Sequence, residues 1–362
     1  MSTIKVNNLE SSTGGGVAAK LTSVNGGAIG TRNLIINGAM NVAQRGTSST
    51  TNGYQTVDRF TPNTGGTDET PTYAQVDVAS GTGPYTSGFR KAFKVTNGNQ
   101  ASGAGGADFI QVEYRIESQD LAQSGWNYTS SSSDVTLSFW IKSSVSKDFQ
   151  IVLRTVDGTS QSFQFETPTL SADTWTKVTK TIPGNSNLQF DNNNDVGLRL
   201  FLFPYIGTDY TDSGNTLNDW VASASNTYGV VDGTSWYTTN DATFEITGLQ
   251  LEVGSESTPF PHKTFTEDLA LCERYFQIVF ARAQNDYQSG GPAAFGVSVG
   301  FHAKMRVSPT VTITNASNAG VSNIAANQIH PYGLFWRFTG STTSGGTTTQ
   351  MAEADLQLSS EL

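Results

Sequence analysis

Short apolar runs that alternate with polar residues limit the folds open to this chain more than any other feature of its sequence. Over Val135–Ile141 every second side chain is apolar, which places the apolar groups on one face of an extended strand. The run Val196–Phe203 alternates too, with leucines on one face and Arg199, Phe201 and Phe203 on the other, so we expect both faces to be partly covered. Such runs are separated by turn-forming pairs: Asp157-Gly158, Pro183-Gly184 and Asp232-Gly233. The pattern favours an antiparallel β-sandwich or jelly roll.

Composition agrees with a chain built from sheets. Only 14% of residues are charged, 37 are glycine, and 10% are aromatic. Helices draw on Leu, Ala, Glu and Lys, whereas strands and tight turns tolerate this mixture. A length of 362 residues allows two or three domains, each with its own core.

The pattern divides the chain into a short segment, two domains and a helix between them. Residues 1–32 are polar and glycine-interrupted, so they cannot bury a core alone and need a partner. Residues 33–263 are expected to form a large antiparallel β-sandwich of the jelly-roll kind, similar to carbohydrate-binding modules. Residues 264–276 are expected to form a linking helix, because Thr264-x-x-Glu267 is a capping box and Leu269, Cys272 and Phe276 share a face. Residues 277–362 then form a smaller C-terminal β domain.

The charge of the chain excludes several classes of partner. The net charge is −10, from 31 acidic and 21 basic residues, and no Lys/Arg run occurs, so we expect no nucleic-acid binding. No stretch approaches the roughly 18 apolar residues of a membrane span, so we expect no membrane insertion. The first residues lack a secretory h-region, which predicts synthesis in the cytoplasm. The single Cys272 excludes an internal disulfide, and its apolar surroundings predict a buried, inert thiol.

Several signals resemble those of enzymes without meeting their requirements. Gly296–Gly300 fits G-x-S-x-G, but the alternation continues through it and no helix follows, so Ser298 is expected to be an ordinary strand residue. Glu113 and Glu117 share a face of one expected strand, as glycosidase acids would, although solvated surface carboxylates are the favoured interpretation. The 3 histidines have no metal-ligand spacing, and no phosphate-binding loop is present. We therefore predict no catalytic residue and no cofactor.

One acidic run has the spacing of oxygen ligands. Asp191, Asn193 and Asp195 alternate as calcium ligands do, but the later positions of an EF-hand are missing. A solvated turn is the favoured interpretation and no metal site is predicted, with calcium kept as the alternative.

Aromatic residues mark the candidate binding surface. Sugar rings present apolar C–H faces that stack on flat side chains, while Asn and Asp bind their hydroxyls. The candidate receptor- or glycan-binding residues lie in a long polar segment and in the C-terminal domain: Trp220, Trp236, Tyr237, Tyr332 and Trp336. The alternative, favoured for most aromatics of the long segment, is that they fix it to the sandwich. Trp126, Trp140 and Trp175 lie in or beside expected strands and are core candidates.

Two distant stretches carry short words that recur together. Asn33–Phe60 contains NLIING, then QRG, then DRF, and Phe244–Phe276 contains GLQLEVGS, then TPF, then LALCERYF. This order resembles a recurrent module of bacteriophage tail-fibre proteins and spans 33–276. The same two stretches are expected to open and close one sandwich.

The resemblance implies a structural protein of a phage virion. It implies a homotrimer that attaches to phage tail or capsid proteins and contacts a glycan or protein of the host cell surface. Because residues 1–32 cannot bury a core alone, we expect them to be the anchor. A head fibre or capsid decoration of the same family is an alternative. A virion-borne glycan-degrading enzyme is a further alternative, but the chain shows no convergent acid pair and no internal repeat.

Overall fold

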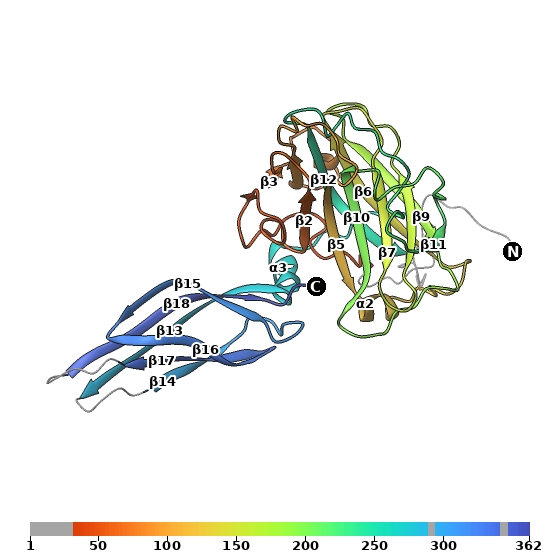
Figure 1. Cartoon of the computed structure of the whole chain (residues 1–362). Helices are drawn as coiled ribbons and strands as arrows, with labels where there is room; N and C mark the ends of the chain where they lie inside the picture. Colours follow the sequence, from red (N-terminus) through yellow and green to blue (C-terminus); the bar gives the residue numbers. More distant parts are fainter. Residues whose placement is uncertain (1–31, 289–293, 341–346) are drawn as a thin grey trace, which may run out of the picture.

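A computed structural model describes residues 32–288, 294–340 and 347–362, and the expected anchor at 1–32 lies almost wholly outside them. The prediction of an all-β fold is confirmed, because every strand pairing among the described residues is antiparallel (Figure 1). None of the helices in these ranges is long and apolar enough to cross a lipid bilayer.

A sandwich of two six-stranded sheets forms the larger domain (Figure 1). The first sheet has the order β1 (Ser48–Ser49), β3 (Thr72–Asp77), β4 (Lys91–Thr96), β12 (Thr243–Val253), β6 (Asp134–Ser143), β9 (Thr176–Pro183). The second sheet has the order β11 (Trp220–Ala222), β8 (Gln161–Glu166), β7 (Gln150–Thr155), β10 (Val196–Ile206), β5 (Phe109–Glu117), β2 (Phe60–Gly65). Short helices α1 (Gly83–Thr86) and α2 (Ser118–Ala122) lie in connections.

The core lies between the sheets, where the alternating residues meet. In β6, the predicted inward side chains Leu137 and Phe139 have 0% exposure. In β10, Leu200 and Leu202 face the core, while Phe201 and Phe203 are buried on the other side, so the prediction that both faces are covered is confirmed. Burial of such large apolar side chains contributes about 1.5–3 kcal/mol each.

The opening and closing stretches lie side by side in the sandwich. Asn33 Nδ2 donates to the Leu249 carbonyl at 3.1 Å, and Asn33 Oδ1 accepts from the Leu251 amide at 3.0 Å. Leu34 N donates to the Leu251 carbonyl at 2.9 Å, so the first described residues run along β12.

The linking helix α3 covers Phe265–Glu273 and begins with the predicted capping box. Glu267 N donates to Thr264 Oγ1 at 3.3 Å, and Thr264 N donates to Glu267 Oε2 at 2.8 Å. Cys272 is a free, buried cysteine, as predicted, and burial raises the pKa of its thiol well above the ordinary value.

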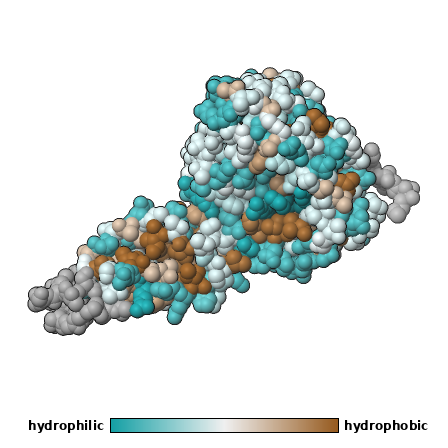
Figure 2. Space-filling model, in the orientation of Figure 1, coloured by the Kyte–Doolittle hydropathy of each residue, from teal (hydrophilic) through white to brown (hydrophobic). Residues whose placement is uncertain are grey.

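The C-terminal domain consists of two three-stranded sheets beside the sandwich (Figure 1). Their orders are β13 (Phe276–Gln288), β18 (Thr347–Ser359), β15 (Thr310–Ala319) and β14 (Ala294–Gly300), β17 (Gly333–Gly340), β16 (Val321–His330). Figure 2 shows hydrophobic residues gathered on the surface of this domain. Phe280 is 60% exposed.

Buried ion pairs join the two domains. Arg59 is 1% exposed, its Nη1 lies 2.6 Å from Glu361 Oε2, and its guanidinium stacks on the ring of Tyr275. Arg274 donates to both carboxylate oxygens of Glu117, each at 2.8 Å. We call Arg59, Glu117, Arg274, Tyr275 and Glu361 the joint. Arg59 comes from the DRF motif, and Arg274 and Tyr275 come from the CERYF motif. Glu117 is the last residue of β5.

Candidate functional site

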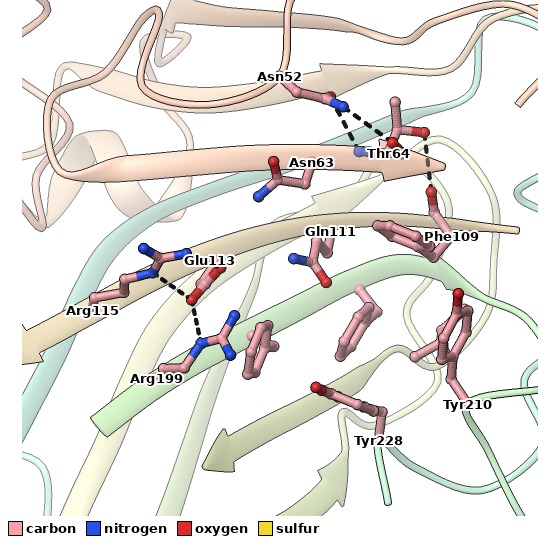
Figure 3. A pocket seen from close by; sticks show the side chains of 13 residues that line it. Asn52, Asn63, Thr64, Phe109, Gln111, Glu113, Arg115, Arg199, Tyr210 and Tyr228 are labelled. Atoms are coloured by element: carbon pink, nitrogen blue, oxygen red, sulfur yellow. Dashed lines mark hydrogen bonds and ion pairs between the residues drawn. The ribbon is translucent and has the colours of Figure 1, made fainter. Parts of the chain in front are cut away.

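A groove of about 410 Å³ lies on the outer face of the second sheet (Figure 3). It crosses β2, β5 and β10, and its lining mixes aromatic rings, amides and ionised groups. The lining residues that carry the argument below are Phe109, Gln111, Glu113, Arg199, Tyr210 and Tyr228. A concave site with a few polar groups among aromatic walls is the usual form of a small-ligand pocket.

Side chains of β5 point alternately into the core and into the groove. Ile110, Val112 and Tyr114 point into the core with at most 1% exposure. Gln111 and Glu113 alternate with them and therefore face outward into the groove. The register pairs Glu113 with Phe201 of β10, so the groove floor combines a carboxylate and an aromatic strand.

The segment 207–233 folds back over the outer face and builds one wall of the groove. The Tyr228 ring meets Phe201 edge-on at a centroid distance of 5.4 Å and Phe203 at 5.8 Å. Arg154 lies over the same Tyr228 ring, 3.7 Å from its centroid. Tyr210 packs edge-on against Phe109 at 5.7 Å, which places a second tyrosine at the rim.

Glu113 lies between two arginines at the base of the groove (Figure 3). Its Oε1 accepts from Arg115 Nε at 2.7 Å and from Arg199 Nε at 2.6 Å. Burial would raise the pKa of Glu113, but hydrogen bonds and charges of the two arginines outweigh burial and lower it below the usual value. Glu113 is therefore a carboxylate at neutral pH.

The interpretation of Glu113 and Glu117 as solvated surface carboxylates is wrong. Glu113 is 1% exposed and pairs with Arg115 and Arg199, and Glu117 is 0% exposed and pairs with Arg274. Glu117 pairs with Arg274 in the joint and does not line the groove, whereas Glu113 does line it.

Three of the aromatic candidates from the long segment are not available to a ligand. Trp220 is 6% exposed and its Nε1 donates to the Pro183 carbonyl, while Trp236 is 0% exposed and donates to Thr243. Tyr237 is 1% exposed and its hydroxyl donates to an Asp108 carboxylate oxygen. Their expected exposure is wrong, and the favoured alternative for this segment, that such rings fix it to the sandwich, describes these residues.

The C-terminal candidates divide. Trp336 is 0% exposed and lies in the core of that domain, which corrects the expectation of an exposed ring there. Tyr332 is 66% exposed and stacks on His330 with a centroid distance of 5.7 Å. Tyr332 is thus accessible, but it lies away from the groove.

The turn at Asp191, Asn193 and Asp195 is held by local contacts. Asn193 Oδ1 accepts from the Asp195 amide at 3.0 Å, and Asp195 Oδ1 lies 3.8 Å from the Arg306 guanidinium. No group of three or more His, Cys, Asp or Glu within the described ranges gathers as a metal site. The calcium alternative gains no support from these contacts.

Ser298 lies in β14, and the residues after this strand form no helix, as the sequence predicted. The side chain of Ser298 is not near a sharp strand-to-helix turn. The strand–turn–helix arrangement that presents such a nucleophile is therefore missing at this position.

Sequence reasoning did not select the groove. Tyr210 and Tyr228 lie in the aromatic segment but were not distinguished from the buried rings beside them. Arg199 and Gln111 belong to outward positions of predicted strands, and that alternation was the one available signal. Only the tertiary fold brings these strands and the segment together.

No known protein-family model matches the chain, and no curated protein is similar enough to count as a relative. Solved structures resemble part of it at low similarity. A putative sugar binding protein from Bacteroides thetaiotaomicron is 11% identical over 61% of this chain and 99% of that chain, with a TM-score of 0.35. The N-terminal cellulose-binding domain of β-1,4-glucanase C from Cellulomonas fimi is 12% identical over 60% of this chain and 99% of that domain, with a TM-score of 0.28.

The enzymatically active domain of tailspike protein 4 from bacteriophage CBA120 is also similar at this level. It is 9% identical over 61% of this chain, with a TM-score of 0.32, and the match spans only 21% of the tailspike chain. Similarity this low assigns no function.

Proposed function

We propose that this protein is a fibre protein of a bacteriophage virion that binds a host cell-surface glycan in the groove of the second sheet. The observation that carries the glycan proposal is the lining of that groove. Tyrosines stand at its wall and rim, and amide and ionised groups face the same space.

The groups in the groove match the chemistry of a sugar ring. The apolar C–H face of a pyranose stacks on Tyr210 or Tyr228, which are half-buried and held by neighbouring aromatic rings. Gln111 both donates and accepts hydrogen bonds, while Glu113, which is 1% exposed, holds Arg115 and Arg199 at the base of the groove. Arg199 has a side chain that is 31% exposed, so part of its guanidinium remains open to ligand oxygens.

Binding without catalysis fits these residues better than hydrolysis does. Glycosidases of the acid–base type use a pair of carboxyl groups, one of them with a raised pKa. Glu113 is the one carboxylate that the groove lining contains within the described part of the chain, and its pKa is lowered. We therefore propose a binding protein, with the glycan-degrading enzyme as the disfavoured alternative.

The virion assignment is supported by the ordered words NLIING, QRG, DRF, GLQLEVGS and LALCERYF. We propose a homotrimer anchored to tail proteins through residues 1–32, and the hydrophobic surface of the C-terminal domain supports self-association (Figure 2). A head fibre of the same kind is the second candidate. Immunogold labelling of purified virions distinguishes a tail location from a head location.

The groove proposal predicts which variants lose binding. Tyr210→Ala and Gln111→Ala should each weaken binding about tenfold, because they remove a stacking surface or a hydrogen-bonding group worth about 1–2 kcal/mol. The measurement is a titration calorimetry series with the tightest bacterial surface polysaccharide from a glycan array.

Tyr332→Ala is the matched control, since it removes an exposed tyrosine outside the groove and should leave affinity unchanged. Equal affinities for the parent and the Tyr210→Ala and Gln111→Ala proteins would show that the glycan binds elsewhere. Affinity lost in the Tyr332→Ala protein alone would move the site to the C-terminal domain.

A further inference from the structure

A second cavity, of about 280 Å³, lies on the outer face of the first sheet. Its floor comes from β6 and β12, β9 borders it, and residues 258–262 form a wall. The groove described above lies on the outer face of the other sheet. The core separates the two sites, so they can bind independently.

Two polar side chains on the floor, Ser138 and Gln250, each have an oxygen that is open to the cavity. Ser138 and Gln250 face each other across the β6–β12 ladder and are 3% and 1% exposed. Gln250 Nε2 donates to the Glu252 carboxylate and lies 3.4 Å from the Thr258 carbonyl, which fixes the orientation of the amide. Within the described residues, neither Gln250 Oε1 nor Ser138 Oγ has a hydrogen-bond partner, although both residues line the cavity.

Neither oxygen is among the fully enclosed side-chain atoms that lack a partner, so the cavity gives solvent or a ligand access to both. Both groups border a cavity large enough for a ligand. A ligand hydroxyl can donate to Gln250 Oε1 and exchange a hydrogen bond with Ser138 Oγ.

Aromatic rings form the sides of the cavity. Trp140 lines it and is only half-buried, which corrects the prediction that this ring belongs to the core. Phe260 also lines the cavity and contacts the rings of Phe89 at 4.9 Å and His262 at 5.0 Å. The floor is therefore polar while the sides are flat and apolar.

A cation without a partner borders the same space. Lys177 lines the cavity and pairs with Trp140 across the β6–β9 ladder. It is exposed and makes no ion pair within the described ranges, whereas the nearby Lys142 lies 3.0 Å from Glu245. In a chain of net charge −10, an unpaired lysine beside a tryptophan favours an anionic ligand.

We propose that this cavity is a second saccharide site that takes one pyranose residue carrying a carboxylate. The ring stacks on Trp140, its hydroxyls bind Ser138 and Gln250, and its carboxylate meets Lys177. The volume lies just below the lower end of the roughly 300–1,000 Å³ range of ligand pockets, so it suits one ring rather than an oligosaccharide.

The closing motif supplies much of this site. Gln250, Glu252 and Thr258 are polar residues of this motif. The Glu252 carboxylate accepts hydrogen bonds from Thr258 N at 2.7 Å and from Thr258 Oγ1 at 2.6 Å. This network ties the residues after β12 to the strand and holds Phe260 at the wall of the cavity. The closing motif therefore contributes residues both to β12 and to the second cavity.

The test uses the full chain labelled with 5-fluorotryptophan and observed by ¹⁹F NMR. The probes are methyl β-D-glucuronide and methyl β-D-glucoside, and Trp140→Phe assigns the resonance of interest. We expect the glucuronide to shift the Trp140 signal saturably at millimolar concentration and to bind several-fold more tightly than the glucoside. Ser138→Ala should weaken binding about fivefold, and Lys177→Met should remove the preference for the acid.

Trp175→Phe is the matched control, because Trp175 lies beside β9 but does not line the cavity, and it should leave the titration unchanged. Gln111→Ala, in the groove, should also leave it unchanged, so failure of one site is distinguishable from failure of the other. The proposal is overturned if neither probe shifts the Trp140 signal, if glucoside and glucuronide bind equally, or if Ser138→Ala and Lys177→Met bind like the parent.

Discussion

Glu117 is a completely buried carboxylate that is surrounded by donors. It accepts from Arg274 through both oxygens, from Tyr275 Oη at 2.5 Å and from Gln119 Nε2 at 2.5 Å. Burial would raise the pKa of Glu117, but the hydrogen bonds and the charge of Arg274 outweigh burial and lower it below the ordinary 4.5. One ionised side chain therefore connects β5 of the sandwich to the end of α3.

Replacing Glu117 by Gln should destabilise the protein by about 3–5 kcal/mol, because Arg274 then faces an amide instead of a charge. Urea unfolding at neutral pH measures the loss. Glu256→Gln is the matched control, since Glu256 is exposed and the change should stay within about 0.5 kcal/mol. Equal midpoints for the parent and the Glu117→Gln protein would contradict the assignment.

The lowered pKa of Glu117 predicts a pH dependence with a definite sign. The carboxylate stabilises the fold fully above its unfolded pKa, and that contribution is lost as the pH falls through the lower folded pKa. The stability gap between parent and Glu117→Gln should therefore narrow below about pH 4.5. Urea midpoints of both proteins from neutral to acid pH measure the gap, and a gap that stays constant would contradict the linkage.

At the scale of the element, β12 depends on one glycine. Gly248 has φ +65°, and a Cβ there would lie 2.6 Å from Phe89 Cζ. The register of β12 against β6 shifts between Thr247 and Gln250, so Gly248 sits in a bulge. The bulge lets Leu249 face the core while Gln250 faces outward to the second cavity.

Gly248→Ala should destabilise the sandwich by about 2–4 kcal/mol, from the strained φ together with the clash against Phe89. Gly81→Ala is the matched control: Gly81 has φ +83° but nothing within 4 Å of the added Cβ, so it should show the φ strain alone. Thermal unfolding of both variants measures the difference. A loss in the Gly248→Ala protein no larger than in the Gly81→Ala protein would exclude the clash.

Elements follow from the sequence where their cause is local. The alternation of Val135–Ile141 and the capping box at Thr264 each lie within a few residues, and both are present as predicted. Glu113 could not be placed from sequence, because its partner Arg199 is 86 positions away. Trp220 was misjudged for the same reason: its burial depends on a segment that returns to the Pro183 carbonyl. The candidate groove is formed by contacts between residues that are far apart in the sequence.

At the scale of the whole molecule, we expect the joint to couple the unfolding of the two domains. Arg59 is enclosed, pairs with Glu361 at 2.6 Å and donates to the Arg115 carbonyl at 2.8 Å. If the domains separated, the Arg59 guanidinium would lose Glu361 as its partner and would either remain in apolar surroundings or become exposed to water with its neighbours. The cost of breaking such a buried pair is about 3–5 kcal/mol.

The described part of the chain should therefore unfold in a single calorimetric transition, with equal van't Hoff and calorimetric enthalpies. Arg59→Met should lower the midpoint and split the transition into two, because the domains lose their coupling. Arg282→Met is the matched control, since Arg282 is 53% exposed and lies 3.9 Å from Glu353. Two transitions already present in the parent protein would disprove the coupling.

The position of β12 has a consequence for how the protein is made. This strand lies between β4 and β6 in the first sheet, yet it follows both by a long stretch of chain. While a ribosome adds about 5–20 residues per second, the emerging β4 and β6 wait with unpaired edges that attract other chains. The first sheet is therefore complete only after β12 has been synthesised. We expect a chain whose synthesis stops before Thr243 to bind chaperones or to aggregate.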